Sequence, residues 1–197
     1  MATSNVPDEF KQELIEKHWD INVDHEWWDC VYDTFKEDMK EKGIEVVRMY
    51  FSGFYSQGDG ACFDGLVPVS QFSKFMEVHD LVSRFPAAKF FADNNDLRLD
   101  MYHAHHHYYH ENTVDVSLMD ISGNPYEDFS TRWEVYDTMQ TLFHDEEQDL
   151  FEVECEEIVK GYMRELYSRL QKDYEYLTSE EVVWETIVAN ELHLEIA

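Results

Sequence analysis

The chain has 197 residues, of which 15 are Lys or Arg and 43 are Asp or Glu, so its formal net charge is −28 with histidine neutral. Apolar residues make up 44% of the chain and aromatic residues 15%, which excludes a disordered acidic tail. Because an excess of carboxylates repels phosphates, we expect no direct binding to nucleic acid or to an anionic membrane. We expect a basic partner instead.

The cysteines and the hydropathy pattern predict a cytoplasmic protein. Cys30, Cys62 and Cys155 are an odd, widely spaced set that suits neither a disulfide framework nor a paired zinc motif. Residues 1–6 contain neither the basic nor the apolar region of a secretory signal. No stretch approaches the roughly 18 apolar residues of a membrane span.

Two helices are predicted in the first 43 residues. Residues 7–18 begin with Pro7 and Asp8, which favour a helix start. From Glu26 to Lys42 apolar side chains recur at helical spacing, and Gly43 suits the position just after a helix.

Two hairpins are predicted to follow. The first pairs residues 44–54 with residues 61–65 across the glycine-containing loop 56–60. The second pairs residues 97–109 with residues 113–120, where apolar and polar side chains alternate. Between the hairpins we expect a helix over Val69–Phe85 that Pro86 ends.

The last third of the chain is predicted to be helical after a turn at Ser122–Tyr126. Residues 132–143 form one helical segment, and residues 145–176 form either one long helix or two. Thr178 and Glu181 have capping-box spacing and open a last helix.

These elements predict an α+β fold with one antiparallel sheet of about four strands and helices packed on it. We expect a single domain over residues 1–197. Its parts are a helical segment at 1–43, a sheet-containing core at 44–122 and an acidic helical part at 126–197.

Three stretches resemble a family of small bacteriophage and mobile-element proteins. They are Tyr50–Gly65 (YFSGFYSQGDGACFDG), Tyr108–Glu111 (YYHE) and Glu175–Glu191 (EYLTSEEVVWETIVANE). No activity or catalytic residue is established for that family. The resemblance therefore implies only a setting, a phage gene product that acts in the cytoplasm of a bacterial host.

The most specific compositional feature is a run of eight acids in 13 residues with no base among them. On a helix, carboxylates at a rise of about 1.5 Å per residue imitate the phosphates of DNA, which occur every ~1.7 Å of axis. A solvated helix face is the alternative interpretation. Phage proteins that imitate DNA to block restriction enzymes have a similar composition. The acids are Asp145, Glu146, Glu147, Asp149, Glu152, Glu154, Glu156 and Glu157.

A histidine cluster at residues 103–110 offers a rival site. On one strand His103, His105 and His107 would project from the same face and hold a divalent metal. Glu111 would complete the ligand set, or else Asp59 and Asp64. The alternative is a solvent-facing or aromatic-packed histidine surface, with no metal bound.

The sequence thus favours a non-enzymatic phage inhibitor that binds a basic, DNA-handling or defence protein as a DNA mimic, without a cofactor. A metal-dependent hydrolase centred on the histidines is the alternative, and an antitoxin-like binder of a basic toxin is a weaker one. A homodimer stays open. The loop 57–60 lacks the Lys and Ser/Thr of a phosphate-binding loop, and Cys62 is expected to be a small buried hydrophobe.

Overall fold

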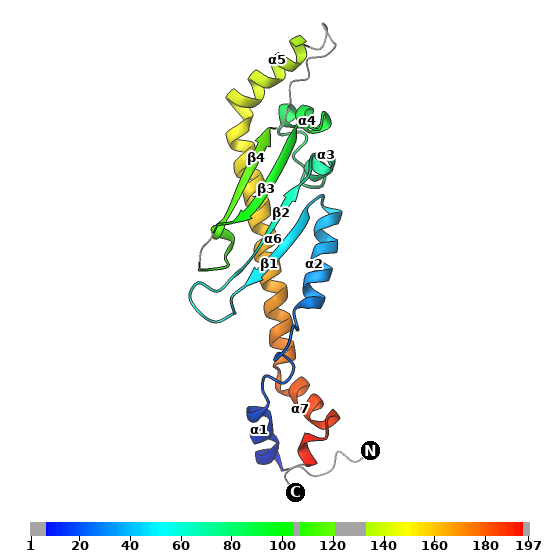
Figure 1. Cartoon of the computed structure of the whole chain (residues 1–197), viewed down its shortest axis with the longest axis vertical. Coiled ribbons are helices and arrows are strands. Elements are labelled where there is room, and N and C mark those ends of the chain that lie inside the picture. The colour runs from blue at the N-terminus through cyan, green and yellow to red at the C-terminus, as the bar shows by residue number, and fades with distance from the viewer. Residues whose placement is uncertain (1–6, 105–106, 121–132, 195–197) are drawn as a thin grey trace. The chain divides into compact units, whose positions relative to one another are not determined.

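The computed structural model describes residues 7–104, 107–120 and 133–194, and it confirms the predicted α+β fold (Figure 1). The strands are β1 (Glu45–Phe51), β2 (Ala61–Val67), β3 (Leu97–His103) and β4 (Val114–Asp120). The α-helices are α1 (Asp8–Lys17), α2 (Asp29–Glu41), α3 (Val69–Val78), α4 (Pro86–Asp93), α5 (Trp133–Leu142), α6 (Gln148–Leu177) and α7 (Glu180–Ala189). Among the helices described, none combines the length and apolar character needed to cross a membrane.

The four strands form one antiparallel sheet in the order β1-β2-β3-β4, as the two predicted hairpins require. A bulge interrupts the β1–β2 register between Val46 and Arg48. The β3–β4 ladder runs the full length of both strands. The β2–β3 ladder stops at the pair Gly65–Met101, so these two strands separate toward the end of the sheet that carries the hairpin loops.

The chain divides into two compact units. One unit contains residues 1–33 and 168–197, and the other contains residues 34–167. Helices α2 and α6 contribute residues to both. The single domain expected from the sequence stays a prediction.

The smaller unit is held by a compact apolar core between α1 and α7. Leu14 and Ile15 pack with Val183 and Ile187, and all four side chains are buried. Ser179 begins α7 as its N-cap, because its hydroxyl accepts a hydrogen bond from the Val182 N–H.

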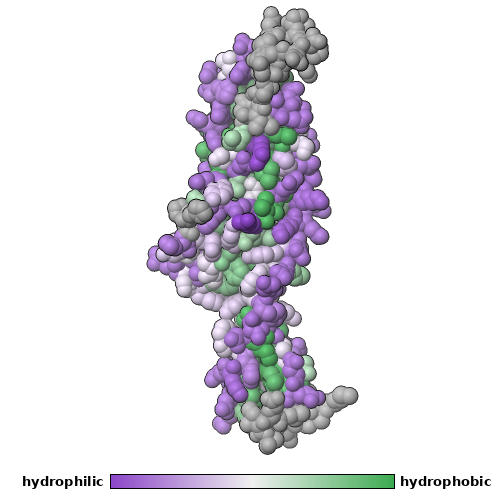
Figure 2. Space-filling model, in the orientation of Figure 1, coloured by the Kyte–Doolittle hydropathy of each residue, from purple (hydrophilic) through white to green (hydrophobic). Residues whose placement is uncertain are grey.

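The larger unit has an aromatic core between the sheet and its helices. Phe151 of α6 packs on Phe72 of α3, Phe85 and Phe143. In β3 the side chains on one face of the strand are buried, whereas Tyr102 on the other face is exposed. The helices therefore cover one face of the sheet. Over the sheet in Figure 2, hydrophobic side chains show between hydrophilic ones.

The helix predicted over Val69–Phe85 is wrong in its extent. It ends at Val78, and Pro86 begins the separate helix α4 instead of only ending the earlier one. Proline suits the first turn of a helix because the N–H that it lacks would have no intrahelical partner there.

We predict that Phe151→Ala lowers the free energy of unfolding by about 3–5 kcal/mol, because the ring is fully buried and its removal leaves a cavity. The matched control is the adjacent Leu150→Ala, which should change it by less than about 0.5 kcal/mol because Leu150 is 67% exposed. Urea unfolding of both variants measures the difference. Equal losses would contradict the assignment of the buried face of α6.

A second prediction concerns His79, which packs on Phe75 and Tyr162. Burial, and then the nearby Lys42 ammonium, lower the pKa of His79 from its usual value of 6.5. The unfolded chain therefore binds the proton more tightly than the folded protein. The stability that the neutral ring contributes is present above pH 6.5 and is lost as the pH falls through the lowered folded value.

His79→Phe removes this titration, so its unfolding free energy should fall less than that of the wild type between about pH 7 and 5. Urea unfolding at several pH values compares the two slopes. Identical slopes would show that His79 titrates normally in the folded state.

Candidate functional site

The eight acids of the predicted carboxylate ladder occupy three different environments. Asp145, Glu146 and Glu147 lie in a π-helical turn, Phe143–Glu147, which joins α5 to α6, and the other acids lie on α6. The exposed members are Asp145, Glu146, Asp149 and Glu157, the half-buried members are Glu152, Glu154 and Glu156, and the buried member is Glu147.

Glu147 binds the first turn of α4. Its carboxylate accepts the Ala87 N–H at 3.2 and 3.1 Å and the Ala88 N–H at 3.1 Å, and the residue is only 8% exposed. The amides at a helix N-terminus have no intrahelical acceptor and carry partial positive charge, so they compensate a buried carboxylate. Glu147 is therefore a structural acid and is not available to a partner.

Glu154 is also engaged, in a bidentate pair with Arg84. The guanidinium donates two hydrogen bonds to the carboxylate, at 2.9 and 2.8 Å. These bonds lower the pKa of Glu154 from its usual value. Because both side chains are partly exposed, the pair contributes modestly to stability, but it neutralises one member of the run.

Glu152 and Glu156 also have partners within the unit. Glu152 accepts the backbone N–H of Leu118 at 3.3 Å, so it covers part of the edge strand β4. Glu156 pairs with Lys160 one turn further along α6, at 2.6 Å. The ladder predicted from the sequence is thus interrupted by acids that hold the fold together.

One solvent-facing side of α6 and of the π-helical turn before it remains, and we name it the acidic face. Asp149, Val153 and Glu157 recur every four residues, and Leu150 precedes Val153 by three, so these four side chains share one side of α6. Leu150 and Val153 are exposed there, at 67% and 58%. Glu146 and Asp149 have no ionic partner among the described residues. The acidic face consists of Glu146, Asp149, Leu150, Val153 and Glu157.

The histidines do not share one strand face. β3 ends at His103, and its Nε2 lies 3.1 Å from the carbonyl oxygen of Tyr108. His107 is exposed in the loop beyond the strand, and His105 lies outside the described residues. The expected alignment of His103 with His107 along a strand is therefore wrong, because β3 ends at His103 and His107 lies in a bend.

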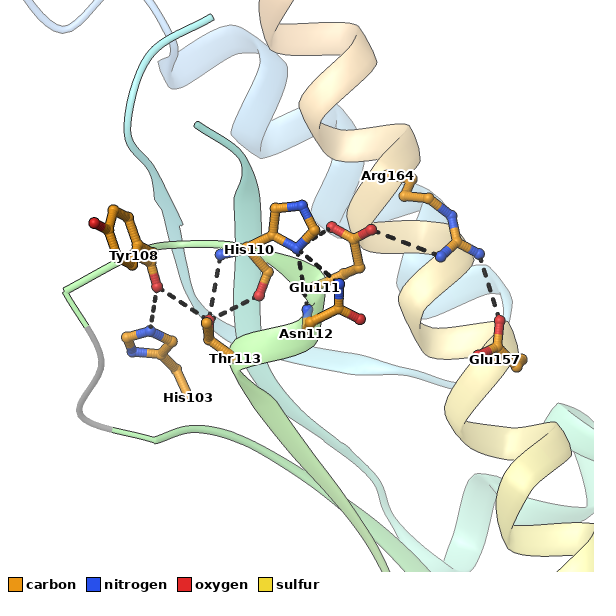
Figure 3. Close-up of polar contacts among 8 residues, drawn as sticks. All are labelled: His103, Tyr108, His110, Glu111, Asn112, Thr113, Glu157 and Arg164. Atoms are coloured by element: carbon orange, nitrogen blue, oxygen red, sulfur yellow. Dashed lines mark hydrogen bonds and ion pairs between the residues drawn. The ribbon is translucent and has the colours of Figure 1, made fainter. Parts of the chain in front are cut away.

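Glu111 points toward α6 and takes part in a different set of contacts (Figure 3). Its Oε2 lies 2.8 Å from His110 Nδ1, and its Oε1 lies 3.8 Å from the Arg164 guanidinium. Arg164 lies at the same distance, 3.8 Å, from Glu157. This chain of charges connects the β3–β4 loop to the acidic face of α6.

The two aspartates considered as further metal ligands are occupied by hydrogen bonds. Asp59 accepts the N–H groups of Tyr55 and Ser56, and Asp64 accepts a backbone N–H and a phenol. Among the residues that the structure describes, no three His, Cys, Asp or Glu side chains form a group suited to a metal ion. The metal site stays a prediction.

The sequence suggested Asp64 only as an alternative metal ligand, whereas the structure gives it a role in the sheet. Its Oδ1 accepts the His103 N–H at 2.6 Å, and its Oδ2 accepts the Tyr50 hydroxyl at 2.8 Å. Burial, and then this hydrogen bond, raise the pKa of Tyr50, which keeps the phenol protonated as a donor. The carboxylate replaces the ladder bonds that β2 and β3 lack beyond Gly65. The feature of the sequence that could have indicated this role is an aspartate within an otherwise apolar strand.

Cys62 is fully buried beside this network, as expected. Burial raises the pKa of the Cys62 thiol to about 12, so the thiol stays neutral at physiological pH. A neutral thiol is a poor nucleophile, and the side chain acts as a small apolar group.

We predict that Glu147→Gln lowers the free energy of unfolding by about 1.5–3 kcal/mol, because the amide replaces a charged acceptor of buried N–H groups. Glu146→Gln, the adjacent exposed control with the same chemical change, should change it by less than about 0.5 kcal/mol. Thermal and urea unfolding measure both. If the two substitutions have equal effects, Glu147 is not the cap of α4.

Comparisons with known proteins give one assignment. Neither the search of curated proteins nor the search of solved structures finds a match. The model of the family described as Domain of unknown function (DUF8835) matches residues 27–180, which is most of the chain. The chain therefore belongs to this family of unknown function.

Proposed function

We propose that this protein is a non-enzymatic, acidic inhibitor that binds a bacterial DNA-handling or anti-phage defence protein at its basic DNA-binding surface. The single observation that carries the proposal is the acidic face, where Glu146, Asp149 and Glu157 are exposed to solvent and the ionic contact that the described residues provide is the long one from Arg164 to Glu157. The resemblance to bacteriophage proteins supports the setting. A net charge of −28 supports the preference for a basic partner.

The spacing of the exposed acids suits a surface that holds DNA. Glu146 and Glu157 are eleven residues apart, or about 16 Å along the helix axis, which equals roughly five base pairs of duplex. Within the described part of the chain, the ionic contact of Glu157 is the long one of 3.8 Å to Arg164, compared with about 2.8 Å in a good charge-assisted hydrogen bond. A lysine or arginine of the partner can therefore replace Arg164 at little cost.

The mimicry is narrower than the whole run. Glu147 and Glu154 bind residues of the α4 region and Glu152 binds β4, so we expect the partner to meet the exposed acids instead, chiefly those of the acidic face. Leu150 and Val153 lie between its carboxylates. We expect them to add apolar contact area that a DNA backbone lacks, so the protein competes with DNA without copying it fully.

The test uses the fraction of a bacterial lysate that binds immobilised duplex DNA at low salt. The wild-type protein should bind a protein of this fraction saturably, and free duplex DNA should displace that protein. The variant Glu146→Gln/Asp149→Asn/Glu157→Gln should bind it roughly ten- to a hundredfold more weakly, since each exposed ion pair contributes ~1 kcal/mol or less. Binding should also weaken steeply with salt, because the Debye length falls from ~10 Å at 0.1 M to ~3 Å at 1 M.

The matched control removes three exposed acids of α1, as Glu9→Gln/Glu13→Gln/Glu16→Gln. Its net charge changes equally, so it should keep the wild-type affinity if the acidic face is the binding site. The proposal fails if both triple variants lose affinity equally, which indicates bulk charge, or if neither loses affinity.

A further inference from the structure

The two hairpin loops at one end of the sheet lie outside the acidic face and form an ordered structure of their own. We name residues 53–60 of the β1–β2 loop and residues 107–113 of the β3–β4 segment the loop pair. It contains most of the motif SGFYSQGDG and all of YYHE. The sequence has no lysine or arginine between Arg48 and Lys74, or between Arg98 and Arg132, so the loop pair itself contains neither residue, and the cation that approaches its Glu111 is Arg164 of α6.

The first loop is held in one conformation by Asp59. Its carboxylate accepts the N–H of Tyr55 at 2.8 Å and that of Ser56 at 2.6 Å, and the Asp59 N–H closes the turn onto the Ser56 carbonyl at 3.1 Å. A Cβ at Gly58 would lie 2.9 Å from the Tyr108 ring, and one at Gly60 would lie 2.6 Å from a backbone oxygen of the second loop. The loops therefore fit together only with glycine at these positions.

The second loop is fixed at its backbone around Tyr108. The Tyr108 carbonyl accepts a hydrogen bond from the Thr113 hydroxyl at 3.0 Å and lies 3.1 Å from His103 Nε2. The same hydroxyl also approaches the His110 carbonyl, at 2.8 Å. Figure 3 shows the Tyr108 ring directed away from His110, Glu111 and Arg164. The Tyr108 ring is therefore attached to a backbone that hydrogen bonds hold in one position.

Both tyrosines are largely exposed on this ordered support, Tyr55 at 72% and Tyr108 at 58%. Exposed tyrosines on preorganised loops are typical of protein recognition surfaces, because a rigid amphipathic ring contacts a partner at little further entropic cost. Asp59 holds the backbone of Tyr55, and Asp64 holds the backbone of His103, whose ring lies beside the Tyr108 carbonyl.

The geometry points to a docking surface at Tyr55 and Tyr108 for an arginine-bearing segment of a protein partner. The faces of tyrosine rings attract cations, and a planar guanidinium stacks on them. The loop pair contains no lysine or arginine that would repel an incoming arginine, and the net charge of −28 favours a cation over a nucleic-acid phosphate. This site goes beyond the acidic face and does not depend on it.

The experiment is a titration of the full-length protein, labelled for NMR, with the peptide acetyl-Gly-Arg-Gly-Arg-Gly-amide. We expect saturable chemical-shift changes at residues 53–60 and 107–113. The citrulline version of the peptide has nearly the same shape but no charge, and it should bind at least roughly tenfold more weakly, because the cation supplies the attraction. Equal binding of the two peptides, or shifts confined to α6, would overturn the assignment.

Variants separate the rings from the rest of the protein. Tyr55→Leu/Tyr108→Leu should weaken peptide binding about tenfold, whereas Tyr55→Phe/Tyr108→Phe should keep it within about twofold. Tyr55→Leu alone is a safeguard against loop unfolding, because Tyr108 still covers Gly58, and it should weaken binding about threefold. Tyr176→Leu removes a ring that is 63% exposed in the other unit and should change nothing.

The acidic-face triple variant should keep the loop shifts. This result separates failure of the docking site from failure of the proposed inhibitor function. If the leucine variants bind the arginine peptide as the wild type does, the tyrosines are not the site.

Discussion

Burial of one side of α6 and its preceding π turn is the constraint on which the larger unit depends. Phe143, Glu147, Phe151, Cys155 and Val159 succeed one another at intervals of four residues, and all are buried. In a straight α-helix, a repeat of four drifts around the axis, whereas a π turn is wider and reduces this drift at its own position. The π turn thus allows both Phe143 and Glu147 to face the core, where Glu147 binds the N-terminus of α4.

The same constraint assigns a role to each acid. The acids on the buried side or its flanks hold α4, Arg84 and β4, and those on the opposite side are left to solvent. The acids that form one run in the sequence therefore divide into two sets in the fold, those that bind other parts of the unit and those that face solvent. We expect removal of the buried Glu147 to cost stability, whereas substitutions of the exposed acids should cost little.

The early end of the β2–β3 ladder shapes the other end of the sheet. Asp64 accepts the His103 N–H that a longer ladder would pair, and the chain then turns back so that Tyr108 and His110 pack on the glycines of the first loop. The acidic face and the loop pair are connected by the Glu111–Arg164–Glu157 contacts (Figure 3). The partners proposed for both surfaces are cationic, in agreement with the charge of the chain.

Hydrophobic alternation and glycine positions predicted the strands and turns well, because these elements depend on residues close together in the sequence. Alternation in residues 113–120 and the glycines of loop 56–60 indicated the hairpins, and Gly43 has the positive φ of 83° that suits a position after a helix. The sequence could not show that Glu147 caps α4, because that contact joins residues 60 positions apart. It also could not show that the His103 N–H at the end of β3 donates to the Asp64 carboxylate, since Asp64 lies on another strand, 39 positions away.

The central claim is that the carboxylates of the acidic face meet a basic protein. Zero-length carbodiimide coupling tests it directly, because it joins a carboxylate to a lysine only where the two are in contact. With the partner retained from the DNA-binding fraction, mass spectrometry should find cross-links from Glu146, Asp149 and Glu157, and none from Glu147. Cross-links spread evenly over the exposed acids, or concentrated on Glu9, Glu13 and Glu16 of α1, would contradict the account.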